Sequence, residues 1–452
     1  MQIGASGNLW IDRHDGRSAR HELWDIVSHC EGLLVIDLLS NSSMTDRAMF
    51  YCHDTYGLGH LRRTMALANH VSVKIPDMSQ LIVTGSPIAH AFAFPAATDY
   101  VKLPSVTKNS AGEYVSGSLS SSFASIRDMR SDILLSAAKH FQPDFLIVDH
   151  APAGLDGEAI ATLRHLRRHH PGTKLIVGLR DIIDEGPKVR RAWALEGIHE
   201  LLDDLYDLIL VYGHRHVYDV VEEYGLSDVA ARKTRFVGYL GRGRGFVSAA
   251  AVRARLPMQT DKLVVVTAGG GKDGQELINA MARGMAQPGR SAGEAFDCLL
   301  IGGPLMGDED RTRLHDLLGT RSNVHLLDFT DQMTSYIGAA DVVVSMGGYN
   351  SVCEILSAGR PAIIVPRVTP RKEQLIRAEI LNRRGIVRMI HPDDLTPASL
   401  LDATRGLLDG THTVANPMPM DGLTNFVGEL RSLMPDLRFM PSASATPVAV
   451  PA

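Results

Sequence analysis

Short runs of apolar residues recur along the chain, and amphipathic stretches separate them. The runs form two blocks, Met49–Cys52, Leu81–Val83, Phe145–Val148, Leu175–Val177, Leu208–Val211 and Phe236–Val237, then Leu263–Val266, Cys298–Ile301, Val324–Leu327, Val342–Val344, Ala362–Val365 and Ile386–Met389. Runs of this length are typical of parallel strands buried on both faces, with crossover helices between them. The pattern predicts an α/β fold with two Rossmann-like domains.

The segments around these blocks set the expected domain boundaries. Residues 1–46 precede the first clear strand as an N-terminal extension, and residues 47–240 form the first Rossmann-like domain. Residues 241–260 are expected to be an interdomain linker, because their alternating glycines suit a hinge. Residues 261–435 form the second domain, and residues 436–452, rich in Pro, Ala and Ser, form a disordered tail.

Composition and charge exclude several classes of protein. With 45% hydrophobic and 21% charged residues, the chain is typical of ordered globular proteins. A net charge of −5 argues against bulk attraction to nucleic acid. The four cysteines are widely separated, which argues against a disulfide scaffold or a zinc ribbon. No apolar run could span a bilayer and the N-terminus lacks a signal-peptide pattern, so we expect a cytoplasmic protein.

The first candidate site follows the first strand. The segment His53–His60 contains Gly57 and Gly59 in a Gly-x-Gly turn, and a helix begins at about His60. Glycines let the backbone approach a ligand, and a helix N-terminus directs its N–H groups at that ligand. A neutral His60 in this position is a candidate general base. A plain tight turn with a capping histidine is the alternative.

Two further glycine-rich turns follow strands of the second block. Gly269, Gly270 and Gly271 follow Leu263–Val266, in an arrangement suited to cradling phosphate at a helix N-terminus. No Gly-Lys-Ser/Thr sequence completes a Walker A loop here. The second turn, Gly347-Gly348, follows Val342–Val344 and opens a helix that carries Asn350, Ser351 and Glu354.

Glu354 has two interpretations. A carboxylate can accept hydrogen bonds from both hydroxyls of a vicinal diol such as ribose. The alternative is a solvated residue on the surface of the helix.

Polar pairs also end two strands of the first block, Asp149-His150 and Arg180-Asp181. Ligands of open α/β sheets bind at these strand ends, so both pairs are candidates for acceptor contacts.

The third glycine-rich region resembles the nucleotide-sugar half of family 28 glycosyltransferases, which have the GT-B fold. In that family a glycine-rich turn, a ribose-binding Glu, a Gly-x-Pro step and an acidic-or-Gln/Gln pair occur in this order. The similar positions here are Gly347-Gly348, Glu354, Gly359-Arg360-Pro361 and Glu373-Gln374. The resemblance covers about residues 49–435 and departs from the family pattern at the basic, proline-containing segment Arg367–Lys372.

The resemblance implies two Rossmann-like domains that face each other across a cleft, with the last helix, about Gly422–Met434, packed on the first domain. It also assigns donor contacts beyond Glu354. The loop with Phe329, Thr330 and Met333 would hold the nucleotide base, and Gly269–Gly271 would face the diphosphate. The remaining donor-binding candidates are Gly57, Gly59, Gly347, Gly348, Asn350, Ser351, Glu373 and Gln374.

Glu373 and Gln374 would set the preference for the sugar, with simple helix capping as their alternative role. The implied reaction transfers a hexosyl group from a UDP-sugar to an acceptor hydroxyl with inversion. His60, or a carboxylate such as Asp149, would be the base, and neither a metal nor a cofactor other than the donor is implied. An Asp308-Glu309-Asp310 sequence is expected to cap a helix instead of binding a metal.

The acceptor would be a carbohydrate or a lipid-linked molecule. A lipid-linked acceptor would bring the protein to the inner face of the membrane as a peripheral protein. Arg62 and Arg63 are candidates for this contact, with an ordinary solvated helix face as the alternative. Two other functions stay open, a UDP-sugar 2-epimerase and a non-catalytic nucleotide-sugar-binding protein. No contact with nucleic acid is expected.

Overall fold

The computed structural model describes residues 46–54, 59–109, 112–241, 243, 247–269, 274–286, 296–303, 306–319, 321–410 and 418–438, with the side chains of 435–438 left aside. Several sequence-based predictions therefore lie outside the described residues. They are the extension up to residue 45, Gly57, Gly270, Gly271 and the tail from residue 439.

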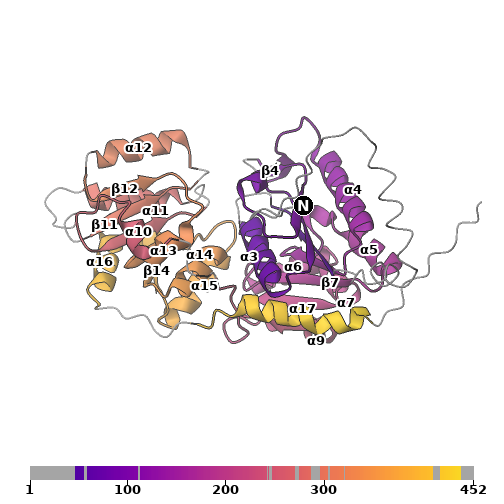
Figure 1. Cartoon of the computed structure of the whole chain (residues 1–452). Helices are drawn as coiled ribbons and strands as arrows, with labels where there is room; N and C mark the ends of the chain where they lie inside the picture. Colours follow the sequence, from indigo (N-terminus) through magenta and orange to yellow (C-terminus); the bar gives the residue numbers. More distant parts are fainter. Residues whose placement is uncertain are drawn as a thin grey trace, which may run out of the picture. The chain divides into compact units, whose positions relative to one another are not determined.

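The first sheet contains seven parallel strands (Figure 1). Their spatial order is β3 (Thr98–Lys102), β2 (Ser79–Thr84), β1 (Arg47–Cys52), β6 (Phe145–Asp149), β7 (Lys174–Arg180), β8 (Leu208–Tyr212) and β9 (Thr234–Phe236). From β1 the chain adds β2 and β3 on one side, and then returns to add β6 to β9 on the other side. The strand order therefore reverses at β1 and β6, where Tyr51 of β1 lies opposite both Val83 and Val148. This reversal is the point at which open α/β sheets bind their ligands.

The second sheet contains six parallel strands. Their spatial order is β12 (Val324–Leu327), β11 (Asp297–Ile301), β10 (Leu263–Thr267), β13 (Val342–Ser345), β14 (Ala362–Ile364) and β15 (Arg388–Met389). Here the order reverses between β10 and β13. Every strand expected from the apolar runs is present in one of the two sheets, so the predicted α/β fold with two Rossmann-like sheets is confirmed.

Helices pack on these sheets. Those of the first domain are α3 (Gly59–Lys74), α4 (Phe123–Phe141), α5 (Ile160–His169), α6 (Gly186–Leu195), α7 (Ile198–Asp204), α8 (Val220–Glu223) and α9 (Asp228–Lys233), with 3₁₀ turns η1 (Ala89–Ala91) and η2 (Leu155–Gly157). Those that follow are α10 (Ala249–Arg253), α11 (Gln275–Ala286), α12 (Asp308–Leu318), α13 (Met333–Ala339), α14 (Tyr349–Ala358), α15 (Glu373–Arg383), η4 (Pro392–Asp394), α16 (Pro397–Leu408) and α17 (Gly422–Arg438).

Some elements differ from the expectation. The edge strand β3 and the hairpin of β4 (Val106–Lys108) and β5 (Tyr114–Ser116) were not predicted, because most of their residues are partly buried or exposed and form no continuous apolar run. The expected linker contains the short helix α10. Helix α17 continues to Arg438, so residues 436–438 are helical and not part of a disordered tail.

The last helix lies against the first domain (Figure 1). Arg431 donates a hydrogen bond to the carbonyl of Lys74, at the end of α3, over 2.6 Å. Asn425 donates to the carbonyl of Val237 over 2.9 Å. Phe426 is fully buried in a hydrophobic cluster that includes side chains of both sheets. One hydrophobic cluster therefore includes side chains of both sheets, and each sheet packs further side chains in a separate cluster of its own.

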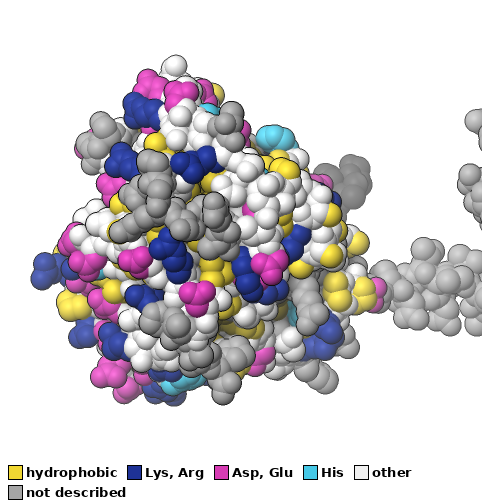
Figure 2. All heavy atoms as spheres, turned by 90° about the vertical axis from the view of Figure 1, so that its left-hand side faces the viewer, with side chains coloured by type: hydrophobic (Ala, Val, Ile, Leu, Met, Phe, Trp, Pro, Cys, Tyr) yellow, Lys and Arg dark blue, Asp and Glu magenta, His cyan; other side chains and the backbone are white. Residues whose placement is uncertain are grey.

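The outer face of the second domain is of mixed charge. Figure 2 views this face, and Lys and Arg side chains lie there among Asp and Glu side chains. None of the helices in the described ranges combines the length and the apolar character that crossing a membrane requires.

Candidate active site

The reversal point of the first sheet brings two of the predicted residues together. His60 lies in the first turn of α3, which follows β1, and Asp149 is the last residue of β6. Because β1 and β6 are neighbours, the two side chains meet at the carboxyl edge of the sheet. Sequence spacing alone does not show this contact, since 89 positions separate the residues.

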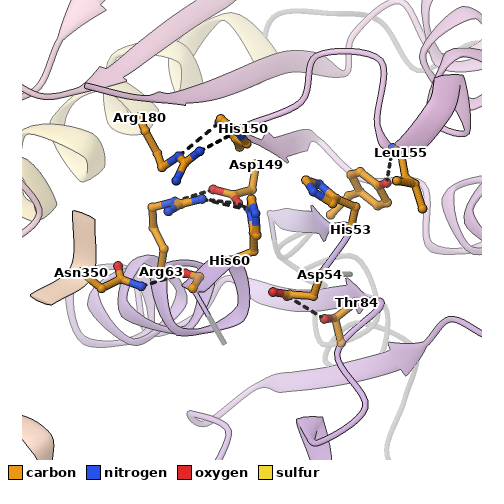
Figure 3. A network of polar contacts seen from close by, with 12 residues as sticks. His53, Asp54, His60, Arg63, Thr84, Asp149, His150, Leu155, Arg180 and Asn350 are labelled. Carbon is orange, nitrogen blue, oxygen red and sulfur yellow. Dashed lines mark hydrogen bonds and ion pairs between the residues drawn. The ribbon is translucent and has the colours of Figure 1, made fainter. Parts of the chain in front are cut away.

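His60 and Asp149 form a hydrogen-bonded pair (Figure 3). The His60 Nδ1 atom lies 2.7 Å from Asp149 Oδ2. An ionised carboxylate can only accept, so this contact assigns the ring proton to Nδ1 and leaves the lone pair on Nε2. Arg63 Nη2 lies 3.1 Å from the same Nδ1, a longer contact. The resulting tautomer is the one that a histidine general base requires.

Arg63 holds Asp149 in its charged form. Its guanidinium donates two hydrogen bonds to Asp149, from Nε over 2.7 Å and from Nη2 over 2.6 Å. Burial alone would raise the pKa of Asp149, but the charge of Arg63 and the hydrogen bond from His60 outweigh burial and keep this pKa well below its usual range. Such a carboxylate is a poor proton acceptor. The geometry thus favours His60 as the base and Asp149 as its positioning partner.

The position of Arg63 overturns one expectation. The arginine was considered for membrane contact or a solvated helix face, but it is only 2% exposed. Its guanidinium also lies 5.7 Å from the centre of the Tyr349 ring. Arg63 is therefore an interior residue that supports the site and cannot reach a membrane surface.

Two further histidines surround His60. The rings of His53 and His150 lie 4.3 Å and 5.4 Å from the His60 ring. Burial lowers the pKa of both well below the ordinary value, so both are neutral. His150 has a φ of +70°, which is unusual for a residue other than glycine. The sequence signal for His53 is its position directly after the first strand, in a His-Asp dipeptide before the glycine turn. No role for His53 is predicted from the sequence.

Asp54 adds a second carboxylate beside His60. It is buried, and its Oδ2 accepts a 3.4 Å hydrogen bond from the Thr84 hydroxyl. Its Oδ1 has no hydrogen-bond partner within the described part of the chain. Burial raises the pKa of Asp54, although the neighbouring His60 opposes this shift. The unpaired oxygen can accept a hydrogen bond from a substrate.

The glycine turns of the second domain lie at the reversal point of its sheet. Gly269 follows β10 with a φ of +67°, and a Cβ at this position would meet nothing within 4 Å. Gly347 follows β13 with a φ of +75°, and a Cβ there would lie 2.6 Å from Ile364 Cγ2. Gly348 is the N-cap of α14 and no side chain caps this helix. The N–H groups in the first turn of α14 are thus available to an anion.

Glu354 does not lie on a solvated helix surface, as its alternative interpretation required. It is fully buried, at 0% exposure. Its Oε1 accepts a hydrogen bond from Arg62 of the first domain. Its Oε2 is buried without a hydrogen-bond partner among the described residues. A buried carboxylate with one unpaired oxygen is costly unless a ligand completes its hydrogen bonds.

The other predicted donor contacts occupy different environments. Phe329 is 45% exposed before α13, which begins at the buried Met333. Thr330 accepts a hydrogen bond from the backbone N–H of Gln332 over 3.0 Å. Asn350 donates to the carbonyl of Gly59 over 2.9 Å, and Ser351 is partly buried in α14. Phe329 is therefore exposed enough for a base to contact its ring.

Glu373 and Gln374 both hold Arg367. Glu373 accepts a 2.8 Å hydrogen bond from the Arg367 guanidinium, and Gln374 accepts a 2.9 Å hydrogen bond from the Arg367 backbone N–H. The N-cap of α15 is Lys372, and no side chain caps the helix. Glu373 is buried, and its Oε2 has no partner in the described ranges. The two side chains thus fix the loop between β14 and α15 at Arg367. Glu373 Oε2 is left to accept a hydrogen bond from a ligand.

Asp181 connects the two domains. Arg377 of α15 donates to both of its oxygens, over 2.7 Å and 2.6 Å, and Tyr239 donates over 3.1 Å. Both residues of the ion pair are buried. Asp181 is a candidate for acceptor contact, and these bonds also give it a role in joining the domains.

No metal site is apparent in the described residues, where no group of three or more His, Cys, Asp or Glu side chains is arranged to hold an ion. The Asp308-Glu309-Asp310 sequence opens α12, as expected. Its N-cap, however, is Gly307 without a side-chain cap, so the predicted capping by Asp308 or Asp310 is wrong.

Comparison with known sequences agrees with this arrangement. Residues 263–429 match the family model described as Glycosyltransferase family 28 C-terminal domain. Over 81 residues the chain is 40% identical to the UDP-N-acetylglucosamine--N-acetylmuramyl-(pentapeptide) pyrophosphoryl-undecaprenol N-acetylglucosamine transferase of Glaesserella parasuis serovar 5 (strain SH0165). This match covers 18% of the chain and 23% of the transferase, so the chain matches about a quarter of that relative's length.

Comparison with solved structures covers both domains. The calicheamicin glycosyltransferase is similar with a TM-score of 0.55 and 17% identity, over 88% of this chain and 100% of that one. A Listeria monocytogenes protein assigned as a UDP-N-acetylglucosamine 2-epimerase is similar with a TM-score of 0.57 and 13% identity, over 88% and 99% of the two chains. Residues 263–429 are thus similar to glycosyltransferase family 28 C-terminal domains, within a chain that has the GT-B fold.

Proposed function

We propose that the protein transfers a glycosyl group from a nucleotide-diphosphate sugar to an acceptor hydroxyl. The observation that carries this proposal is the His60–Asp149 hydrogen bond at the reversal point of the first sheet. A general base in this position suits the removal of a proton from an acceptor. The family match of residues 263–429 supports a nucleotide-sugar donor for the second domain.

The donor would be a UDP-hexose. Glu354 would accept hydrogen bonds from the ribose hydroxyls, and Phe329 and Thr330 would contact the base. Gly269, Gly348 and the N-terminus of α14 would stabilise the charge of the diphosphate as it leaves, in a manner that needs no metal ion. Glu373 and Gln374 would contact the sugar. Similarity to a transferase whose name includes UDP-N-acetylglucosamine supports uridine as the nucleoside.

In the proposed reaction, the acceptor oxygen attacks the anomeric carbon of the sugar. The bond between that carbon and the diphosphate oxygen breaks with its electron pair on the diphosphate. His60 Nε2 takes the acceptor proton, and Asp149 stabilises the imidazolium that forms. One displacement of this kind inverts the anomeric configuration.

The acceptor would be a carbohydrate or a lipid-linked molecule, met in the cytoplasm or at the inner face of the membrane. The lipid carrier in the name of the similar transferase supports a lipid-linked acceptor at the inner face of the membrane. The net charge of −5 supports our expectation that nucleic acid is not a partner.

Mass spectrometry of the full-length protein with UDP-, dTDP- and GDP-sugars tests the donor assignment. We expect UDP-sugars to bind, and UDP release to require an added acceptor. An epimerase, which the fold similarity to the Listeria protein also allows, would convert the UDP-sugar without an acceptor. Binding without any turnover would indicate a non-catalytic nucleotide-sugar-binding protein. Failure of every nucleotide sugar to bind would refute the proposal.

A further inference from the structure

The arginines around the site differ in whether they form an ion pair with a carboxylate. Arg63 forms an ion pair with Asp149, Arg377 with Asp181, and Arg367 with Glu373. Arg180, at the end of β7, forms no ion pair with a carboxylate of the described residues. Its guanidinium contacts only His150 there, from Nη2 to Nε2 over 2.9 Å and from Nε to Nδ1 over 3.4 Å.

The charge of Arg180 is therefore not compensated by its contacts. His150 is neutral and can accept a hydrogen bond, but it supplies no negative charge. Burial, followed by the charge of nearby Arg63, lowers the pKa of Arg180 to about 10, although the carboxylate of Glu373 opposes this shift without forming an ion pair. A partly buried cation with no directly bonded anion is costly, and an incoming anion would relieve this cost.

The position of this pair points to a substrate. His150 contacts Arg180, and its ring is 5.4 Å from the His60 ring (Figure 3). Its left-handed backbone conformation is held by a 2.8 Å hydrogen bond from its N–H to the carbonyl of Gly178. Unfavourable conformations of this kind persist mainly where function requires them.

We propose that Arg180 and His150 bind a phosphate group of a substrate beside the His60 base. A guanidinium donates two parallel hydrogen bonds to a phosphate, and the resulting contact is stronger than a neutral one. The inference rests on the proposed function and adds that one of the two substrates binds beside His60 through a phosphate group. The phosphate belongs either to the diphosphate of the donor or to a phosphorylated acceptor.

Calorimetric titration of Arg180→Gln separates these sources. The probes are UDP, uridine, and inorganic phosphate added to the UDP-saturated protein. If the donor supplies the phosphate, Arg180→Gln weakens UDP binding by about ten- to hundredfold and leaves uridine binding unchanged. If the acceptor supplies it, UDP binding is unchanged and inorganic phosphate no longer binds. Arg180→Lys, which keeps the charge, should recover part of either loss.

A matched control and the melting temperature exclude a structural explanation. Arg190→Gln removes an arginine that donates only to the carbonyl of Glu223 in the described structure, and it should bind every probe as the wild type does. Because Arg180 lacks an anionic partner there, its loss should not lower the melting temperature. UDP and phosphate binding by Arg180→Gln equal to wild type would refute the inference. Failure of the wild type to bind UDP would refute the proposed function instead, since inorganic phosphate can then be titrated into the protein without UDP, and its dependence on Arg180 measured separately.

Discussion

Arg62 of the first domain and Glu354 of the second are in direct contact, although 292 positions separate them in the sequence. The Arg62 guanidinium donates a hydrogen bond to the carboxylate that we expect to bind ribose, and this carboxylate is fully buried. Oε2 of Glu354 is open to one ribose hydroxyl, but a nucleotide has to displace Arg62 before Oε1 is equally free to accept a hydrogen bond from the second hydroxyl.

Arg62→Ala should therefore increase the affinity for UDP. The side chain of Arg62 is partly exposed, and ion pairs of this kind contribute up to about 1 kcal/mol, which corresponds to a gain of about fivefold. Isothermal titration calorimetry measures the change. Arg127→Ala, which removes two exposed ion pairs, with Asp128 and with Asp156, is the matched control. Weaker UDP binding by Arg62→Ala would show that Arg62 contacts the nucleotide and does not compete with it.

His60→Ala should lower the rate of transfer by about 10²–10⁴-fold, the usual effect of removing a general base. Its UDP affinity should change little, because the donor contacts are assigned mainly to the second domain. Single-turnover kinetics at saturating donor and acceptor tests this expectation, with UDP titration in parallel. A rate equal to that of the wild type would reduce His60 to a structural residue.

Most strands of the two sheets could be predicted because their central strands are buried on both faces. Val264, Val265 and Val266 of β10, for example, are all fully buried, so an unbroken apolar run marks the strand. In β3 the pattern is different, since Asp99 and Lys102 are exposed within a partly buried edge strand. No apolar run marks such a strand, so the pattern of apolar residues does not predict it.

Asp54→Asn should stabilise the protein at neutral pH. The folded-state pKa of Asp54 is raised, so between the ordinary value and this raised value the folded state binds more protons than the unfolded state. Stability therefore falls as the pH rises through this interval. The asparagine variant escapes this loss, and its advantage should disappear as the pH falls to about 3.9.

Thermal unfolding at a series of pH values measures the effect. Asp128→Asn, which alters an exposed carboxylate, should show no comparable gain. A melting temperature that Asp54→Asn lowers equally at every pH would mean that Asp54 acts as a structural hydrogen-bond acceptor and not as a strained buried charge.

Gln374→Ala should change the preference between UDP-sugars and spare the affinity for UDP. The expected reason is that Gln374 orders the loop at Arg367 and contacts the sugar, which UDP lacks. Competition between two UDP-sugars, measured together with UDP binding, tests this. Glu379→Ala, at a partly exposed position of the same helix, is the control. An unchanged donor ratio with a lowered melting temperature would leave Gln374 with a structural role alone.

The candidate site could be predicted only in part. The glycine turns and His60 stand directly after buried strands, where the fold places ligands, so their positions follow from the strand pattern. The burial of Arg63 and Glu354 could not be derived in this way. Each depends on one contact made through the tertiary fold, with Asp149 and with Arg62 respectively. An isolated charged residue on a helix is usually solvated, and local pattern carries no signal for such pairs.

UDP binding by Glu354→Gln tests the central claim most directly. Glutamine keeps the volume of the buried side chain but loses the charge that accepts the ribose hydroxyls. We predict that the wild type binds UDP and that Glu354→Gln binds it about ten- to hundredfold more weakly, as expected for hydrogen bonds to a charged group. Equal UDP affinities of the two proteins, or a wild type that binds no UDP, would contradict the assignment of the second domain as the nucleotide-sugar site.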